Sequence, residues 1–128
     1  MKILFLVIAA TLCCPSVLDA QRLATDKTTG EFLKICEFVL NDKKPPTNYE
    51  VAYLNTGICV GYIAGVLDSI PVLQFGGEKK LICLPTSGIQ NERVLELVLQ
   101  QVKKDPSLLK ESIRSIMFAS IRAEYHCQ

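Results

Sequence analysis

The side chains that could support chemistry in this 128-residue chain are mainly cysteines, and their number favours a structural role. Beyond the N-terminal segment there are four of them: Cys36, Cys59, Cys83 and Cys127. An even number of cysteines in a small secreted domain indicates disulfides. A zinc site is the alternative, but there is no Cys-x-x-Cys pair, and His126 is the single histidine. Four cysteines allow three pairings, and spacing alone does not select one.

Catalytic groups are otherwise scarce. His126 would have to act as the base of a catalytic pair, yet it lies beside Cys127. A cysteine in a disulfide is no nucleophile, because the thiolate is the reactive form. The carboxylates form no evident acid–base pair, and Gly76–Gly77 lacks the strand and helix that flank a phosphate-binding loop. We therefore expect no catalytic residue, no metal and no cofactor, and a chain that is not an enzyme.

The first twenty residues have the layout of a secretory signal peptide. Lys2 precedes an apolar run over residues 3–10, and a plausible cleavage site follows Ala20. A retained membrane anchor is the alternative, but the apolar run is short. Lipidation is disfavoured because Leu12, and not a small residue, precedes Cys13. The sequence predicts export, with the periplasm as the destination.

Cleavage would leave residues 21–128 as the mature chain, which is long enough for one small domain. Its basic residues are scattered, and the net charge of the whole sequence is +1. Scattered charges of both signs are typical of a solvated surface. We therefore expect no nucleic-acid partner, and no membrane contact after cleavage.

Hydrophobic periodicity predicts four helices in the mature chain. The first begins at Thr28 or Thr29 and stops before residues 43–46. The second begins at Thr47 or Asn48, carries an apolar face through Val51, Leu54, Ile58, Tyr62 and Val66, and reaches Ile70, where Pro71 ends or kinks it. The third covers about residues 90–104, and the fourth begins around Pro106 and ends near Tyr125. Residues 81–85 form a short apolar run that could be extended. The expected fold is all-α, a small four-helix domain stapled by two disulfides.

A stripe of small residues marks the second helix. Gly57, Gly61 and Gly65 recur at every fourth residue and so share one helix face. Each glycine costs about 1 kcal/mol of helix stability relative to alanine. The cost favours close packing, so we expect Gly61 and Gly65 to lie against another helix or a second copy of the chain, with Tyr62 and Asp68 in the same motif. A membrane dimerisation stripe is the alternative, but the uncharged run ends at Asp68 and is short for a bilayer.

Three segments appear in an order that resembles a known family. They are Cys-Val-Gly-Tyr-Ile-Ala-Gly-Val-Leu-Asp at residues 59–68, Ile-Cys-Leu-Pro at residues 82–85, and Cys127 after an apolar helix. This pattern is similar to the Rap/Tai immunity proteins, which neutralise amidase effectors of the type VI secretion system. The resemblance covers about residues 31–127. The sequence departs from the family at residues 86–90, where an expected helix-capping threonine is missing, and at residues 125–127.

The resemblance implies a helical periplasmic homodimer whose loops occlude the cysteine–histidine cleft of a peptidoglycan amidase. Loops suit this task because they are exposed and tolerate variation. The candidate partner-binding residues fall in two loops: Gln74, Glu78, Lys79 and Lys80, and then Lys103, Lys104, Asp105 and Lys110.

In addition to this resemblance, we predict that the disulfides are Cys36–Cys59 and Cys83–Cys127. The first would join the first two helices, and the second would fasten the chain end to the segment before the third helix. A different class of function stays open. HdeA-like acid-stress chaperones are also small, helical, disulfide-bearing periplasmic proteins, and such a chaperone would expose apolar surface at low pH.

Overall fold

The computed structural model describes residues 27–41, 47–77 and 79–128. Its α-helices are α2 (Thr29–Ile35), α3 (Glu37–Leu40), α4 (Tyr49–Leu73), α5 (Asn91–Lys104) and α6 (Ile113–Glu124), and the 3-10 helix η1 (Pro106–Lys110) precedes α6. The described residues contain no β-strand, only two isolated bridges. The predicted all-α fold with two disulfides is confirmed. The predicted signal peptide lies outside the described residues.

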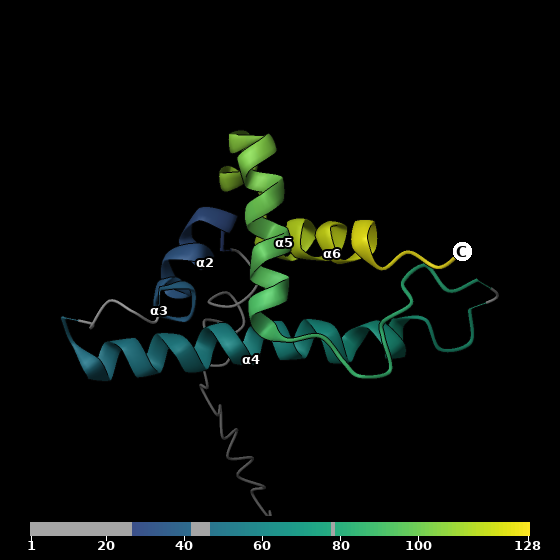
Figure 1. Cartoon of the computed structure of the whole chain (residues 1–128), viewed down its shortest axis with the longest axis horizontal. Coiled ribbons are helices and arrows are strands. Elements are labelled where there is room, and N and C mark those ends of the chain that lie inside the picture. Colours follow the sequence, from purple (N-terminus) through teal and green to yellow (C-terminus); the bar gives the residue numbers. More distant parts are fainter. Residues whose placement is uncertain (1–26, 42–46, 78) are drawn as a thin grey trace, which may run out of the picture.

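Helix α4 is the base on which the other helices lie. In Figure 1 it runs along the bottom of the molecule, and α5 rises from its middle at a steep angle. Helices α2 and α3 lie over the N-terminal half of α4, and α6 lies over the C-terminal half. The segment after α4 extends beyond the end of the helix and returns beside the C-terminus.

The first predicted helix is two short helices. Thr28 caps α2: its hydroxyl accepts from the backbone N–H of Glu31 at 3.3 Å, and the Glu31 carboxylate accepts from the backbone N–H of Thr28 at 2.9 Å. The latter bond lowers the pKa of Glu31. The prediction of one continuous helix was wrong at Cys36, where a backbone at φ −84° and ψ 4° separates α2 from α3.

Helix α4 begins as predicted but ends later. The Asn48 side chain caps it by accepting from the N–H of Val51 at 3.2 Å. The prediction that Pro71 ends or kinks the helix is corrected: α4 continues to Leu73, and the N–H of Gln74 still reaches the carbonyl of Ile70 at 3.2 Å. Proline in the last turn removes one donor only, so the turn around it survives.

The buried face of α4 also differs from the prediction. Cys59, Ile63 and Ile70 are buried, whereas Leu54 and Ile58, which were expected in the core, are 65% and 43% exposed. The prediction failed because α4 is apolar around most of its circumference, so periodicity does not mark its inner face. By length and composition α4 could cross a membrane, and only 17% of its most apolar window is buried. The argument that excluded a span by length was therefore wrong for this helix.

The core lies where α2, α4, α5 and α6 meet. Its fully buried side chains are Phe32, Cys36, Cys59, Ile63, Ile70, Val94, Leu95, Val98, Ile113, Met117 and Ile121. The apolar periodicity of α5 predicts an inner face of Val94, Leu95, Leu97, Val98 and Val102; the first four are buried, and Val102 packs against the core. The capping position of α5 is Gln90, and Asn91 lies in its first turn.

The predicted fourth helix is also shorter. Pro106 begins η1, while α6 begins only at Ile113. The carbonyl of Glu111 accepts from both the N–H and the hydroxyl of Thr29, at 2.8 and 3.0 Å. Ser112 pairs with Thr28 in an antiparallel bridge. These contacts with the start of α2 hold residues 111–112 outside helical geometry.

The two disulfides have the expected pairing. Cys36–Cys59 joins the junction of α2 and α3 to the middle of α4, with a Cα–Cα distance of 5.3 Å, and both residues are buried. Cys83–Cys127 joins the segment after α4 to the chain end, with a Cα–Cα distance of 5.0 Å. One bridge therefore lies in the core, and the other lies at the end of the molecule that carries the candidate site.

Candidate partner-binding surface

Several large apolar side chains are exposed around the C-terminal end of α4. Phe75 is 91% exposed, Val72 73%, Leu73 70% and Leu81 45%. We call these four residues the apolar tip. Exposed apolar side chains gathered in one segment mark an interaction site in a soluble protein. Of these four, Phe75 lies within residues 74–80, the first of the two loops that the sequence offered as contacts, and the other three flank that loop.

The Gln74 side chain closes this loop from inside. Its Oε1 accepts from the backbone N–H groups of Leu81 and Ile82, both at 2.7 Å, and its Nε2 donates to the carbonyl of Ile82 at 2.9 Å. All three bonds join the end of α4 to the returning chain. Gln74 was predicted as a partner contact, but the structure commits its side chain to holding the loop.

The returning chain is also fixed to the C-terminus. Ile82 forms an antiparallel bridge with His126, and the N–H of Cys83 donates to the carbonyl of Tyr125 at 2.7 Å. The Cys83–Cys127 disulfide covers the same junction. The base of the loop is therefore fixed by backbone, side-chain and covalent links.

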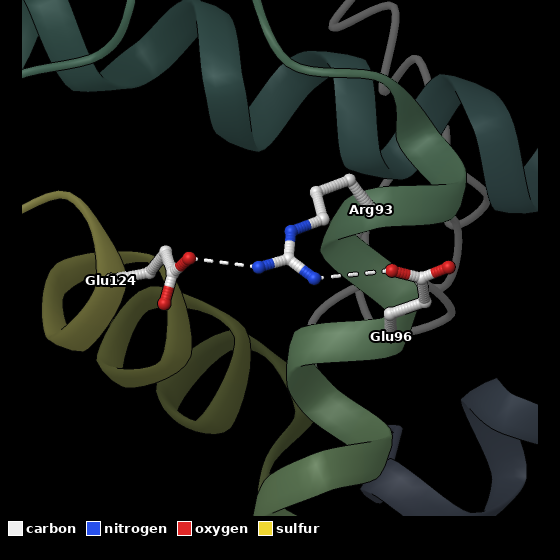
Figure 2. Close-up of polar contacts among 3 residues, drawn as sticks. All are labelled: Arg93, Glu96 and Glu124. Carbon is white, nitrogen blue, oxygen red and sulfur yellow. Dashed lines mark hydrogen bonds and ion pairs between the residues drawn. The ribbon is translucent and has the colours of Figure 1, made fainter.

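An ion-pair network fastens α6, which leads into this junction, to α5. Figure 2 shows Arg93 of α5 between Glu96 on the same helix and Glu124 at the end of α6. The distances from the Arg93 guanidinium are 3.2 Å to Glu96 and 2.7 Å to Glu124. The bond with Glu124 is the main cause that raises the pKa of Arg93, so the side chain stays charged. The pair links the two helices just before the chain reaches Tyr125.

The charge of the described loop is positive. Lys79 and Lys80 are exposed beside the apolar tip. Glu78, the predicted acidic contact, lies outside the described residues. Gly76 has φ +79°, a left-handed conformation that glycine adopts without strain, and it turns the chain directly after Phe75.

The second predicted loop lies elsewhere. Lys103, Lys104, Asp105 and Lys110 are exposed at the end of α5 that points away from α4. Asp105 accepts from the hydroxyl and the N–H of Ser107, at 2.6 and 3.0 Å, and the hydroxyl bond is the main cause that lowers its pKa. The two loops lie at different ends of the molecule, so they do not form one surface.

The glycine stripe faces away from the core. A Cβ atom built on Gly57, Gly61 or Gly65 would meet nothing within 4 Å. The prediction that Gly61 and Gly65 pack against a neighbouring helix of the same chain is wrong. Its alternative, packing against a second copy of the chain, stays a prediction. Tyr62 points inward instead, with its ring centroid 5.0 Å from that of Phe32. Asp68 is exposed on α4 and lines a hollow with Leu84, Pro85 and Ile89.

The residues considered for catalysis have structural positions. Cys127 is in a disulfide, and exposed His126 lies in the bridge with Ile82. Within the part of the chain that the structure describes, no three histidine, cysteine or acidic side chains come together to hold a metal.

Phe75 was missed as an individual residue by the sequence reasoning, although its loop was identified. The predicted contacts in that loop were polar and charged residues, and they did not include the phenylalanine between Gln74 and Gly76. An aromatic residue followed by two glycines cannot continue the apolar face of a helix, and that was the available signal.

Comparison with known proteins supports one family. The family profile of Rap1a immunity proteins matches residues 28–127. No curated protein and no solved structure matched the chain. The match spans every described helix and all four of these cysteines, from the Thr28 cap to Cys127. The chain therefore belongs to the Rap1a immunity protein family.

Proposed function

We propose that the chain is exported to the periplasm, where it binds a peptidoglycan amidase effector of a type VI secretion system and blocks its active-site cleft. The observation that carries this proposal is the family match over residues 28–127, which indicates immunity to a type VI effector and hence a protein partner. The amidase target and the periplasmic location are the finer steps that we propose. Occlusion requires no chemistry from the inhibitor, and we propose that this chain is not an enzyme.

The apolar tip supports this mechanism physically. An inhibitor that fills a cleft needs a protruding group that enters it and a frame that does not yield. The segment that carries Phe75 extends beyond the end of α4, and its base is fixed by Gln74 and by the Cys83–Cys127 disulfide. The loop at residues 103–110 is exposed as well, but half of its residues are charged, so we assign it a smaller part.

We also propose that the mature protein is a homodimer. The outward face of α4 carries Leu54 and Ile58 beside the glycines, and the space over those glycines is open. The stretch between Glu50 and Asp68 is uncharged, so two copies could lie along it without opposing like charges. Sedimentation equilibrium of the mature chain tests this: a single species at the monomer mass across micromolar concentrations contradicts the dimer.

A protection assay tests the proposed function. A panel of peptidoglycan amidases with cysteine–histidine centres is directed to the periplasm of a bacterial host, and cell lysis is followed with and without this chain. Full-length protein should prevent lysis by at least one amidase, whereas the same chain without residues 1–20 should not. Purified protein that binds no amidase of the panel at micromolar concentrations contradicts the proposal.

The same preparation distinguishes the chaperone alternative. An acid-stress chaperone would bind an apolar dye much more strongly when the pH falls, and it would suppress aggregation of unrelated proteins only then. The inhibitor that we propose acts at neutral pH and on its matching amidase alone. Dye binding that rises steeply in acid, together with failed protection, would transfer the assignment to the chaperone.

A further inference from the structure

We infer that Phe75 is the anchor of the inhibitory surface, that it enters an apolar pocket with an acidic rim in the amidase cleft, and that Gln74 is the positioning residue that aims it. This inference rests on the proposed function and adds the residues and the chemistry of the partner pocket. It separates two neighbours in the sequence by role: one touches the partner, and the other holds the loop.

The exposure of Phe75 is the first argument. At 91% it is the most exposed large apolar side chain in the described residues, and Val72 and Leu73, close to it in the chain, are 73% and 70% exposed. Aromatic residues dominate binding energy when a partner buries them in a central pocket. Phe75 lies outside the helical core, so its apolar side chain does not contribute to the stability of the fold.

The order of the loop is the second argument. Gln74 makes three hydrogen bonds of 2.7 to 2.9 Å to Leu81 and Ile82, on the opposite side of the loop. The N–H of Phe75 donates to the carbonyl of Val72 at 3.2 Å, and the N–H of Gly77 to the carbonyl of Gln74 at 3.3 Å. A contact loop that is ordered before binding loses less entropy when it binds. These hydrogen bonds hold the loop in one conformation, in which the Phe75 side chain is exposed.

Charge defines the rim of the partner pocket. Lys79 and Lys80 are exposed in the same short loop as Phe75. A pocket that accepts Phe75 would meet these two ammonium groups at its edge, and acidic groups there would steer the encounter. Two copies of this chain docked tip to tip would instead bring together four lysines against two glutamates, a net positive charge. The tip therefore fits a different protein, with an apolar floor and acidic edge, better than it fits itself.

Four variants test the inference, with the amidase that the wild-type chain binds as the probe. Phe75→Ser should weaken binding by about 30-fold or more, the loss typical of a central aromatic anchor. Tyr49→Ser is the matched control: Tyr49 is an aromatic residue, 57% exposed at the other end of α4 and outside the proposed dimer stretch, and its loss should leave the affinity within about 2-fold.

Gln74 is tested by binding and by amide exchange together. Gln74→Ala should weaken binding about 10-fold and speed hydrogen exchange at the N–H groups of Leu81 and Ile82. Phe75→Ser should leave that exchange unchanged. Gln74→Glu retains an acceptor for both N–H groups and should restore much of the affinity. If Gln74 has only a structural role, Gln74→Ala should lower the melting temperature but leave amidase binding unchanged.

The outcomes separate this inference from the proposed function. If the wild-type chain binds no amidase of the panel, the proposed function fails and the inference fails with it. If the wild type binds and Phe75→Ser binds equally well, the inference alone is overturned. Phe75→Ser that abolishes self-association while sparing amidase binding would assign the tip to a second copy, which also overturns it.

Discussion

Replacing Gly61 by alanine should stabilise the isolated chain, contrary to what its sequence spacing indicates. Regular glycine spacing predicts a crowded helix face, on which any added side chain would overpack. In the structure an added Cβ at Gly61 meets no atom within 4 Å, and Gly61 is exposed in the middle of the 25-residue helix α4. The substitution therefore removes the conformational cost of glycine and introduces no clash.

The expected magnitude follows from helix propensity alone. Alanine is favoured over glycine in a helix interior by about 1 kcal/mol. For a domain of this size, about 1 kcal/mol corresponds to a rise of about 4 °C in the melting temperature. Gly57 and Gly65 have the same open surroundings, so the triple alanine variant should gain about 3 kcal/mol, since the sites share no contact partner.

Thermal unfolding followed by circular dichroism, at a concentration where the chain is monomeric, provides the measurement. Gly30→Ala is the control. A Cβ at Gly30 would lie 3.2 Å from the backbone oxygen of Leu109, so α2 and η1 would have to separate slightly. We expect Gly30→Ala to gain less than Gly61→Ala, or to lose stability.

A fall in the melting temperature of the monomer on Gly61→Ala would refute this reasoning, because it would mean that α4 packs differently. The proposed homodimer adds a second readout. Gly61→Leu should leave the monomer folded and weaken self-association, since a leucine would separate the two helices. Unchanged self-association would place the dimer interface away from the glycine face.

Three further predictions follow from the other links in the fold. Replacing both Cys36 and Cys59 by alanine should cost at least about 3.5 kcal/mol in urea unfolding, because the bridge closes a loop with a sequence separation of 23 and both residues are buried; a loss below about 1 kcal/mol contradicts this. Glu31 has a lowered pKa in the fold, so its stabilisation is present above its ordinary pKa of 4.5 and is lost as the pH falls through the lower folded value; Glu31→Gln should flatten this acid limb of the stability curve. Arg93→Met should lower the melting temperature more at low salt than at high salt, because its contact with Glu124 is exposed; equal effects would mean that packing of the side chain matters instead.

The sequence was most informative where a residue type has one common structural use. Thr28 or Thr29 was expected to begin the first helix and Thr47 or Asn48 the second, and in the structure Thr28 and Asn48 are the caps. The amphipathic pattern of α5 identified its buried residues, because polar residues occupy the opposite face. The two disulfide pairs were predicted correctly, although the spacing of the cysteines alone does not select one of the three possible pairings.

The failures occurred where tertiary contacts decide between local options. Helix α4 is apolar on most sides, so its sequence does not show which face α2 and α5 cover. The break before α6 depends on Thr29, which is more than eighty residues distant in the chain and binds the carbonyl of Glu111. The role of Gln74 depends on Leu81 and Ile82 returning to it, and a pattern within one helix does not record that contact.

The arrangement of links around the tip has a consequence for specificity. The loop is held by three links: the hydrogen bonds of Gln74, the Cys83–Cys127 disulfide and the Ile82–His126 bridge. None of these links involves the side chain at position 75. A substitution at Phe75 can therefore change the shape offered to a partner while the loop keeps its course. Because binding energy concentrates in a few buried residues, one such change would alter affinity more than several changes on the surrounding lysines. An immunity protein that must match one effector and ignore others gains specificity in this way without loss of stability.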